Sequence, residues 1–221
     1  MKILRFDQSF ILFPKKRKPS KTITSLKPVF EKLIYVHQRY IAGEKGKGDD
    51  HPYWYTERPH VGLFAAAVWL SGGTALEEYK TKKSNKHKSN YGRCDLGFRI
   101  GKLGFECEAK RLWLALEYNS ENLANTIYKH KQNGLDQVIE DVKKLQNKDG
   151  LGFCFVIPGI RKSKFPDLNE ILNNLIGSLQ EKNSGWDALV WIGVSKWQAP
   201  KEEKDFFFPG VLLLIKQSNK N

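Results

Sequence analysis

The first third of the chain carries apolar residues at helical spacing in two segments. Residues 26–41 repeat apolar side chains every three or four positions and predict a helix. The alanine-rich segment 60–79 predicts a second helix, which the Gly72-Gly73 pair is expected to bend or to restart with Thr74 as a new N-cap. Residues 1–13 predict a short strand, and the Gly- and Lys-rich residues 43–50 predict a loop.

Further along the chain, the pattern alternates between strands and helices. Residues 81–91 are polar and lysine-rich, and we expect a loop there. Alternating segments predict strands over 91–100 and 105–112, joined by a short turn over 101–104. We expect helices over 121–146 and 167–180, a buried strand over the continuous apolar run 151–157, and further strands over 188–194 and 206–215.

This order of elements predicts an α/β protein with a mixed central β-sheet flanked by helices and an N-terminal helical addition. The sequence contains no internal repeat and no clear domain boundary. We therefore expect one domain over residues 1–221, in which residues 1–21 form a basic N-terminal extension. Its Lys-rich run 14–19 is bracketed by prolines and has the composition of a solvated tether, although it could also contact phosphates.

Charge and cysteine content narrow the class of partner and the compartment. Lys and Arg number 37 against 24 Asp and Glu, a net charge of +13, which favours a polyanion such as nucleic acid as partner. The cysteines Cys94, Cys107 and Cys154 form no C-x-x-C pair and lie in apolar or alternating runs, as buried thiols of a reducing compartment do. No apolar stretch is long enough to span a bilayer, so we expect a cytoplasmic protein without membrane contact.

The two alternating strands each have an apolar face and a charged face. Asp95 lies on the charged face of the first strand, and Glu108 and Lys110 lie on that of the second. If the strands pair with their apolar faces together, Asp95 comes close to Glu108 and Lys110. Two neighbouring carboxylates favour a hard divalent cation such as Mg²⁺ or Mn²⁺, and an adjacent lysine can orient water or stabilise a phosphate. An amphipathic hairpin with a solvated charged face is the simpler alternative.

The acid-x-Lys pattern alone is common in this chain. It also occurs at 78–80, 141–143 and 202–204, in segments predicted to be helix or loop. The tripeptide at 108–110 is the one predicted to lie on a strand beside an aspartate-bearing strand. No pair of histidines has the spacing of an H-x-x-x-H or H-E-x-x-H metal site. Tyr53-Trp54-Tyr55, in a polar loop, could stack on bases.

Residues 92–96 and 105–110 together resemble the active-site hairpin of the PD-(D/E)xK, or restriction-endonuclease-like, nuclease superfamily. The resemblance covers about residues 63–157, and Cys94 replaces the proline that gives the motif its first letter. It implies a metal ion held by Asp95, Glu108 and the Ala109 carbonyl, with Lys110 assisting the water. It further implies a glutamate from the preceding helix, Glu77 or Glu78, and a polar residue on the following helix, for which Gln137 is a candidate.

The resemblance implies a Mg²⁺- or Mn²⁺-dependent endonuclease acting on DNA, in restriction, repair or phage defence. Candidate phosphate contacts are Arg93, Arg99, Lys82, Lys83, Lys86 and Lys88. A homodimer would provide two centres for two strands. The alternatives are a catalytically silent nucleic-acid-binding protein and a subunit that requires a protein partner.

Overall fold

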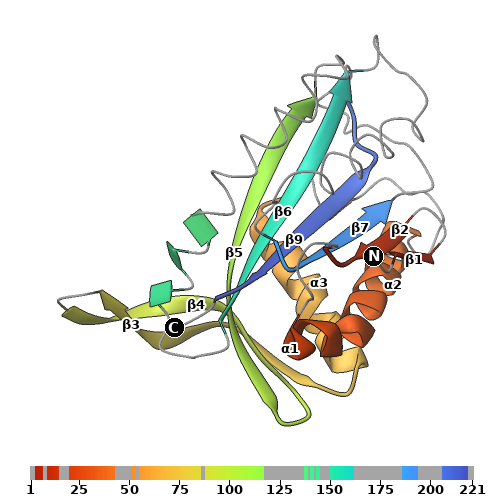
Figure 1. Ribbon diagram of the computed structural model, residues 1–221. Coiled ribbons are helices and arrows are strands. Elements are labelled where there is room, and N and C mark those ends of the chain that lie inside the picture. The colour runs from red at the N-terminus through yellow and green to blue at the C-terminus, as the bar shows by residue number, and fades with distance from the viewer. Residues whose placement is uncertain are drawn as a thin grey trace.

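The computed structural model describes residues 3–6, 9–14, 20–42, 51–52, 55–85, 88–116, 137–138, 140–141, 143–144, 150–161, 186–193 and 206–218. These residues form an α/β fold around one mixed sheet (Figure 1). Its strands are β1 (Ile3–Phe6), β2 (Ser9–Leu12), β3 (Thr74–Asn85), β4 (Lys88–Ile100), β5 (Leu103–Leu116), β6 (Gly150–Arg161), β7 (Ala188–Gly193), β8 (Phe206–Phe207) and β9 (Gly210–Gln217). The helices are α1 (Lys21–Ser25), α2 (Lys27–Ala42) and α3 (Glu57–Leu70).

The strand order is β1-β2-β7-β9-β6-β5-β4-β3, with β8 paired to β6. Among these strands β5 and β6 run parallel, and the other pairs are antiparallel. A parallel pair needs a long crossover, and residues 117–149 provide it. The described residues of this crossover, between 137 and 144, are helical, in agreement with part of the helix predicted over 121–146.

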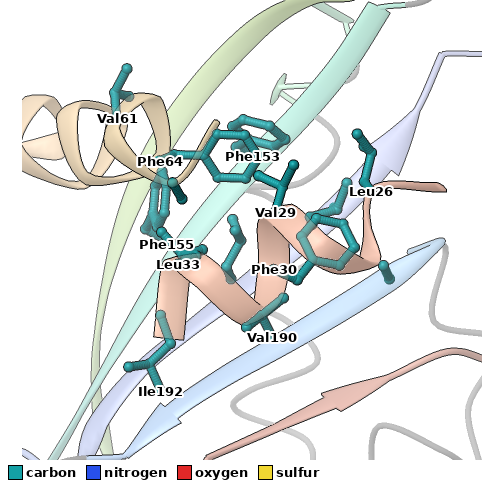
Figure 2. Close-up of a cluster of buried hydrophobic side chains, with 14 of the residues drawn as sticks. Leu26, Val29, Phe30, Leu33, Val61, Phe64, Phe153, Phe155, Val190 and Ile192 are labelled. Atoms are coloured by element: carbon teal, nitrogen blue, oxygen red, sulfur yellow. The ribbon is translucent and has the colours of Figure 1, made fainter. Parts of the chain in front are cut away.

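The hydrophobic core lies between the sheet and helices α2 and α3 (Figure 2). Phe30 and Leu33 of α2 and Phe64 of α3 are fully buried, together with Phe153 and Phe155 of β6. The described side chains of β6 and all those of β7 are buried. Both strands are continuous apolar runs in the sequence because a strand that is covered on both faces needs no polar positions. The helix predicted over 26–41 and the strands predicted over 151–157 and 188–194 are confirmed within the described residues.

The helix predicted over 60–79 is wrong beyond Leu70. Gly72 has a φ of 77°, and the Gly73 N–H donates to the Val68 carbonyl, an arrangement that ends the helix. Gly73 then passes so close to the Arg99 backbone that a side chain would collide with it. Residues from Thr74 onward pair with β4 instead of restarting a helix, so Glu77 and Glu78 lie on strand β3 and not at a helix end.

The lysine-rich loop predicted over 81–91 is also wrong. Residues 79–85 of β3 and 88–94 of β4 form a long two-stranded ribbon, in register from Tyr79↔Cys94 to Asn85↔Lys88. We call this ribbon the arm; it extends from one end of the sheet (Figure 1). The backbone ladder of the β3–β4 pair continues along the arm.

The remaining differences are small. The strand predicted over 1–13 is a hairpin of β1 and β2, and β2 pairs with β7, so part of the expected extension belongs to the sheet. The strand predicted over 206–215 is divided into β8 and β9 around Pro209, which lacks an N–H for the ladder. Predictions for residues 15–19, 43–50, 53–54 and 167–180 lie outside the described residues. None of the described helices is long and apolar enough to cross a membrane.

Candidate active site

The β4–β5 hairpin has the two faces that its sequence predicts. The ladder pairs Leu96 with Cys107 and Phe98 with Phe105, and all four side chains are buried against the helices. The intervening residues of β5, among them Glu106, Glu108 and Lys110, belong to the opposite face. Cys94, Cys107 and Cys154 are buried thiols, as expected.

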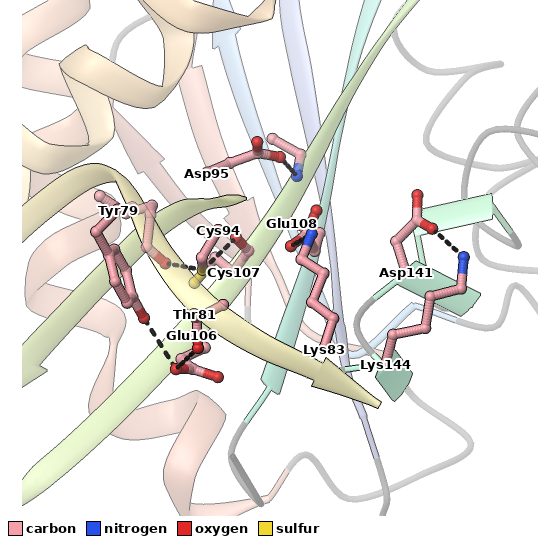
Figure 3. Close-up of polar contacts among 12 residues, drawn as sticks. Tyr79, Thr81, Lys83, Cys94, Asp95, Glu106, Cys107, Glu108, Asp141 and Lys144 are labelled. Carbon is pink, nitrogen blue, oxygen red and sulfur yellow. Dashed lines mark hydrogen bonds and ion pairs between the residues drawn. The ribbon is translucent and has the colours of Figure 1, made fainter. Parts of the chain in front are cut away.

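Asp95 and Glu108 occupy the positions immediately beyond the last ladder pair, Leu96↔Cys107. There β4 separates from β5, and the carboxylate of Asp95 takes the place of a backbone acceptor. Its Oδ2 accepts a 2.7 Å hydrogen bond from the N–H of Ala109 (Figure 3). The Asp95 carboxylate is therefore fixed against the backbone of the residue that follows Glu108.

Glu108 is buried, with 4% of its surface exposed. Burial raises the pKa of its carboxyl group, and the charges of Asp95 and Asp141 raise it further. The Lys83 ammonium opposes this shift, because its Nζ lies 2.6 Å from Glu108 Oε1 (Figure 3). A nearby cation therefore stabilises the negatively charged form of the buried Glu108 carboxylate.

The arm brings Lys83 to this position by folding across the charged face of β5. The β3–β4 ladder skips Glu78 and Asp95, and Glu78 has a φ of 52°, so the alternation of side chains changes there. Beyond this point Tyr79 Oη and Thr81 Oγ1 donate hydrogen bonds of 2.9 and 3.3 Å to Glu106 Oε1. Tyr79, Thr81 and Lys83 thus form the inner face of the arm, directed at the acids of β5 (Figure 3).

Lys110 and Ala109 lie where the resemblance places them along β5. Lys110 is half-buried and forms no ion pair with any residue that the structure describes. Ala109 is fully buried on the core side. The β4–β5 hairpin therefore offers one carboxylate bonded to the backbone (Asp95), one carboxylate paired with a lysine (Glu108) and one lysine without an ion pair among the described residues (Lys110).

Neither candidate for the additional glutamate contacts Glu108 in the described structure. Glu78 forms ion pairs with Arg58 at 2.7 Å and with Arg93 at 3.4 Å. Glu77 lies beside Gly62 of α3, and burial together with the Glu78 charge raises the pKa of its carboxyl group. The charge of Asp141 helps to raise the pKa of Glu108, and Asp141 Oδ1 pairs with the Lys144 ammonium at 2.7 Å. Asp141 was not a site candidate, because it belongs to an acid-x-Lys tripeptide on a predicted helix.

The candidate phosphate contacts separate into two groups. Lys82, Arg93 and Arg99 are exposed, whereas Lys83 is directed inward to Glu108. Lys80 and Tyr91 join Lys82 and Arg93 on the outer face of the arm, where the Lys80 Nζ lies 4.7 Å from the centre of the Tyr91 ring. Tyr91 is 64% exposed. This outer face combines cations with an aromatic ring.

The remaining predicted contacts are Lys86, Lys88 and Gln137. Lys86 lies outside the described residues, and only the backbone of Lys88 is described. Gln137 is exposed at the start of the described helical residues. Its neighbour Val138 packs over Gly152, which pairs with Glu108 in the β5–β6 ladder. Gln137 therefore lies on the helical segment that covers the acid-bearing part of β5.

The carboxylate oxygens of the hairpin are ligands of the kind that bind a hard divalent cation. Asp95 and Glu108 provide carboxylate oxygens, the ligands that Mg²⁺ and Mn²⁺ prefer. Lys83 provides a positive charge where a metal ion would neutralise Glu108. The described residues include no group of three or more His, Cys, Asp or Glu side chains arranged to hold a metal ion.

Comparison of the chain with protein-family models, with characterised proteins and with solved structures gives no match.

Proposed function

We propose that this protein is a Mg²⁺- or Mn²⁺-dependent nuclease that hydrolyses DNA, with a restriction-endonuclease-like core. One observation carries the proposal: Asp95 and Glu108 occupy the positions next to the last pair of the β4–β5 ladder, where the strands separate, and Asp95 is hydrogen-bonded to the Ala109 N–H. Lys110 follows Glu108 on the same face of β5, about 7 Å along the strand. Carboxylates and lysine at this spacing can surround one phosphodiester group.

A metal ion bound by Asp95 and Glu108, with the Ala109 carbonyl as a further oxygen donor, would supply a Lewis acid and a polarised water. The chain's own residues have separate tasks. The Ala109 N–H holds the Asp95 carboxylate in one orientation. Lys110, uncommitted in the described structure, donates hydrogen bonds to the attacking water or to a phosphate oxygen as negative charge develops.

The outer face of the arm is the surface proposed to contact DNA. Lys80, Lys82 and Arg93 carry positive charges on one side of a two-stranded ribbon, and Tyr91 adds an exposed ring. A ribbon of two strands is narrow enough to enter the major groove of a duplex. The net charge of +13 supports association with a polyanion and predicts that binding weakens with salt.

Plasmid cleavage tests the proposal directly. The purified protein is incubated with supercoiled plasmid and Mg²⁺ or Mn²⁺, beside the variants Asp95→Ala and Lys110→Ala. Glu140→Gln, an exposed acid on the described helical residues, serves as the control. We expect nicking or linearisation by the parent and the control, and a loss of at least about 100-fold in both active-site variants. Cleavage that persists in both variants would exclude the assigned centre.

A second candidate function is DNA binding without cleavage. The ion pair between Lys83 and Glu108 favours it, because the lysine takes up the buried carboxylate in the described structure. This candidate predicts salt-dependent DNA binding through the arm and no cleavage under any metal condition. The same assay with an added protein partner would separate a partner-dependent subunit from a silent one.

A further inference from the structure

A shallow trough of about 430 Å³ lies on the face of the sheet that carries Glu106, beside the proposed catalytic hairpin. It extends over strands β3, β4 and β5. Its walls and floor include Leu76, Tyr79, Gly97, Arg99, Gly104 and Glu106. The volume is in the range of small-molecule sites, so one flat ring system with part of its sugar can enter.

Two glycines shape the floor of the trough, one beneath the Tyr79 ring and one that leaves the floor open. Gly97 lies between Leu76 and Glu106 in a row across the three strands, and a Cβ at Gly97 would come within 2.7 Å of the Tyr79 ring. The Tyr79 ring therefore lies where the side chain of residue 97 would otherwise project. A Cβ at Gly104 would meet no atom closer than 3.9 Å, so the floor there is open.

The polar groups of the trough are incompletely used by the protein. Glu106 Oε1 accepts from Tyr79 and Thr81, but the buried Oε2 has no hydrogen-bond partner among the described residues. Arg99 lines the same trough and forms no ion pair with Glu106. A buried acceptor without a donor is costly, so a ligand that donates to it gains free energy.

These features select a ligand that is flat and has a donor edge and an acceptor edge. Guanine has both, because N1–H and N2–H are donors and O6 and N7 are acceptors that arginine commonly binds. Adenine and the pyrimidines lack the combination of two adjacent donors on one edge and two adjacent acceptors on another. Exposed Leu76 and the Tyr79 ring provide apolar surface for the base.

We infer that the trough binds a guanine base of the nucleotide next to the phosphate at Asp95 and Glu108. Glu106 lies two residues before Glu108 on the same strand face, about 7 Å away, a separation that one nucleotide of an extended, unstacked strand can span. The inference deepens the proposed nuclease function and rests on it for the position of the phosphate. The trough itself would still bind guanine if the hairpin were inactive.

Binding without divalent metal tests the trough independently of cleavage. Fluorescence anisotropy is measured in EDTA with 5′-labelled oligothymidylates that carry one central guanine, hypoxanthine or adenine. Hypoxanthine lacks the 2-amino donor of guanine. We expect guanine to bind about tenfold more tightly than adenine, with hypoxanthine in between. Equal affinity for all three oligonucleotides overturns the inference.

Two variants test whether a preference for guanine arises in the trough. Glu106→Gln, which keeps the shape and loses an acceptor, is expected to abolish the guanine preference, whereas Glu140→Gln keeps it. Gly104→Ala narrows the floor without a clash and is expected to weaken binding of the guanine oligonucleotide at least about fivefold. A guanine preference that survives both trough variants overturns the inference, and thermal unfolding confirms that they are folded.

Comparison with the cleavage assay separates the two proposals. Guanine preference that depends on Glu106, in a protein that cuts no DNA, supports the trough and counts against the nuclease. Metal-dependent cleavage without base preference supports the nuclease and overturns the trough.

Discussion

The Lys83 ammonium lies 2.6 Å from the Glu108 carboxylate, although their strands, β3 and β5, are not neighbours in the sheet. The contact forms because the arm departs from the sheet at Glu78 and Asp95 and directs its inner face at β5. A buried acid with a raised pKa thereby gains a cation from within the chain. This ion pair is the feature of the site with the clearest consequences for experiment.

Removal of the Lys83 charge is expected to strengthen metal binding. A divalent ion and the Lys83 ammonium compete for Glu108, so Lys83→Met should raise the affinity for Mn²⁺ about tenfold, or about 1.4 kcal/mol. Calorimetric titration with Mn²⁺ at pH 8 measures this change. Lys82→Met, on the outer face of the arm, is the matched control. An unchanged or weaker affinity in Lys83→Met contradicts the competition.

The buried Glu108 carboxyl is expected to make folding stability fall as pH rises. Since its pKa in the folded protein lies above the ordinary 4.5, the folded state holds more protons than the unfolded state just above that pH. Glu108→Gln, which mimics the neutral acid, should therefore unfold at a higher temperature than the parent at pH 8. The difference should shrink toward pH 4, as thermal unfolding across this range will show. Glu140→Gln should show no such trend.

Two buried histidines are expected to make the protein sensitive to acid. Burial lowers the pKa of His37 to about 4 and that of His60 to about 3, so both stay neutral while unfolded chains protonate near pH 6.5. Stability should fall as the pH drops from 6.5 to 4.5, by up to about 3 kcal/mol per histidine. His60 stacks on Phe155 with ring centres 4.8 Å apart, so His60→Phe can keep this packing. Urea unfolding at pH 7 and pH 4.5 should show a smaller acid-induced loss in this variant; an equal loss would contradict the assignment.

Helix α3 offers a matched pair of aromatic residues for testing the core. Phe64 is fully buried and packs against Phe153, with ring centres 4.6 Å apart, whereas Trp69 is 56% exposed. Phe64→Ala should lower the free energy of unfolding by about 3–5 kcal/mol, and Trp69→Ala by less than about 1 kcal/mol. Denaturant unfolding measures both. Similar losses at the two positions would contradict the way in which α3 packs on the sheet.

The sequence alone predicted much of the β4–β5 hairpin and its surroundings. The two-residue alternation around Asp95 and Glu108 indicates strands and assigns the faces, because adjacent side chains of a strand point to opposite sides. The apolar run 151–157 likewise predicts a buried strand, since a strand covered on both faces needs no polar positions. These local patterns are sufficient because each segment carries its own periodicity.

Where the sequence has no local pattern, the tertiary structure determined the secondary structure and the contacts between distant residues. Residues 74–85 form a strand because β4 supplies backbone partners, and their alanine, glutamate and lysine side chains favour other structures when considered alone. The pairing of Lys83 with Glu108 and the action of Asp141 on the same acid both depend on chain reversals that bring distant segments together. Sequence spacing thus located the acids, whereas the cation and the third acid around them follow from folding, because contacts between distant segments depend on sheet order and on the bend of the arm.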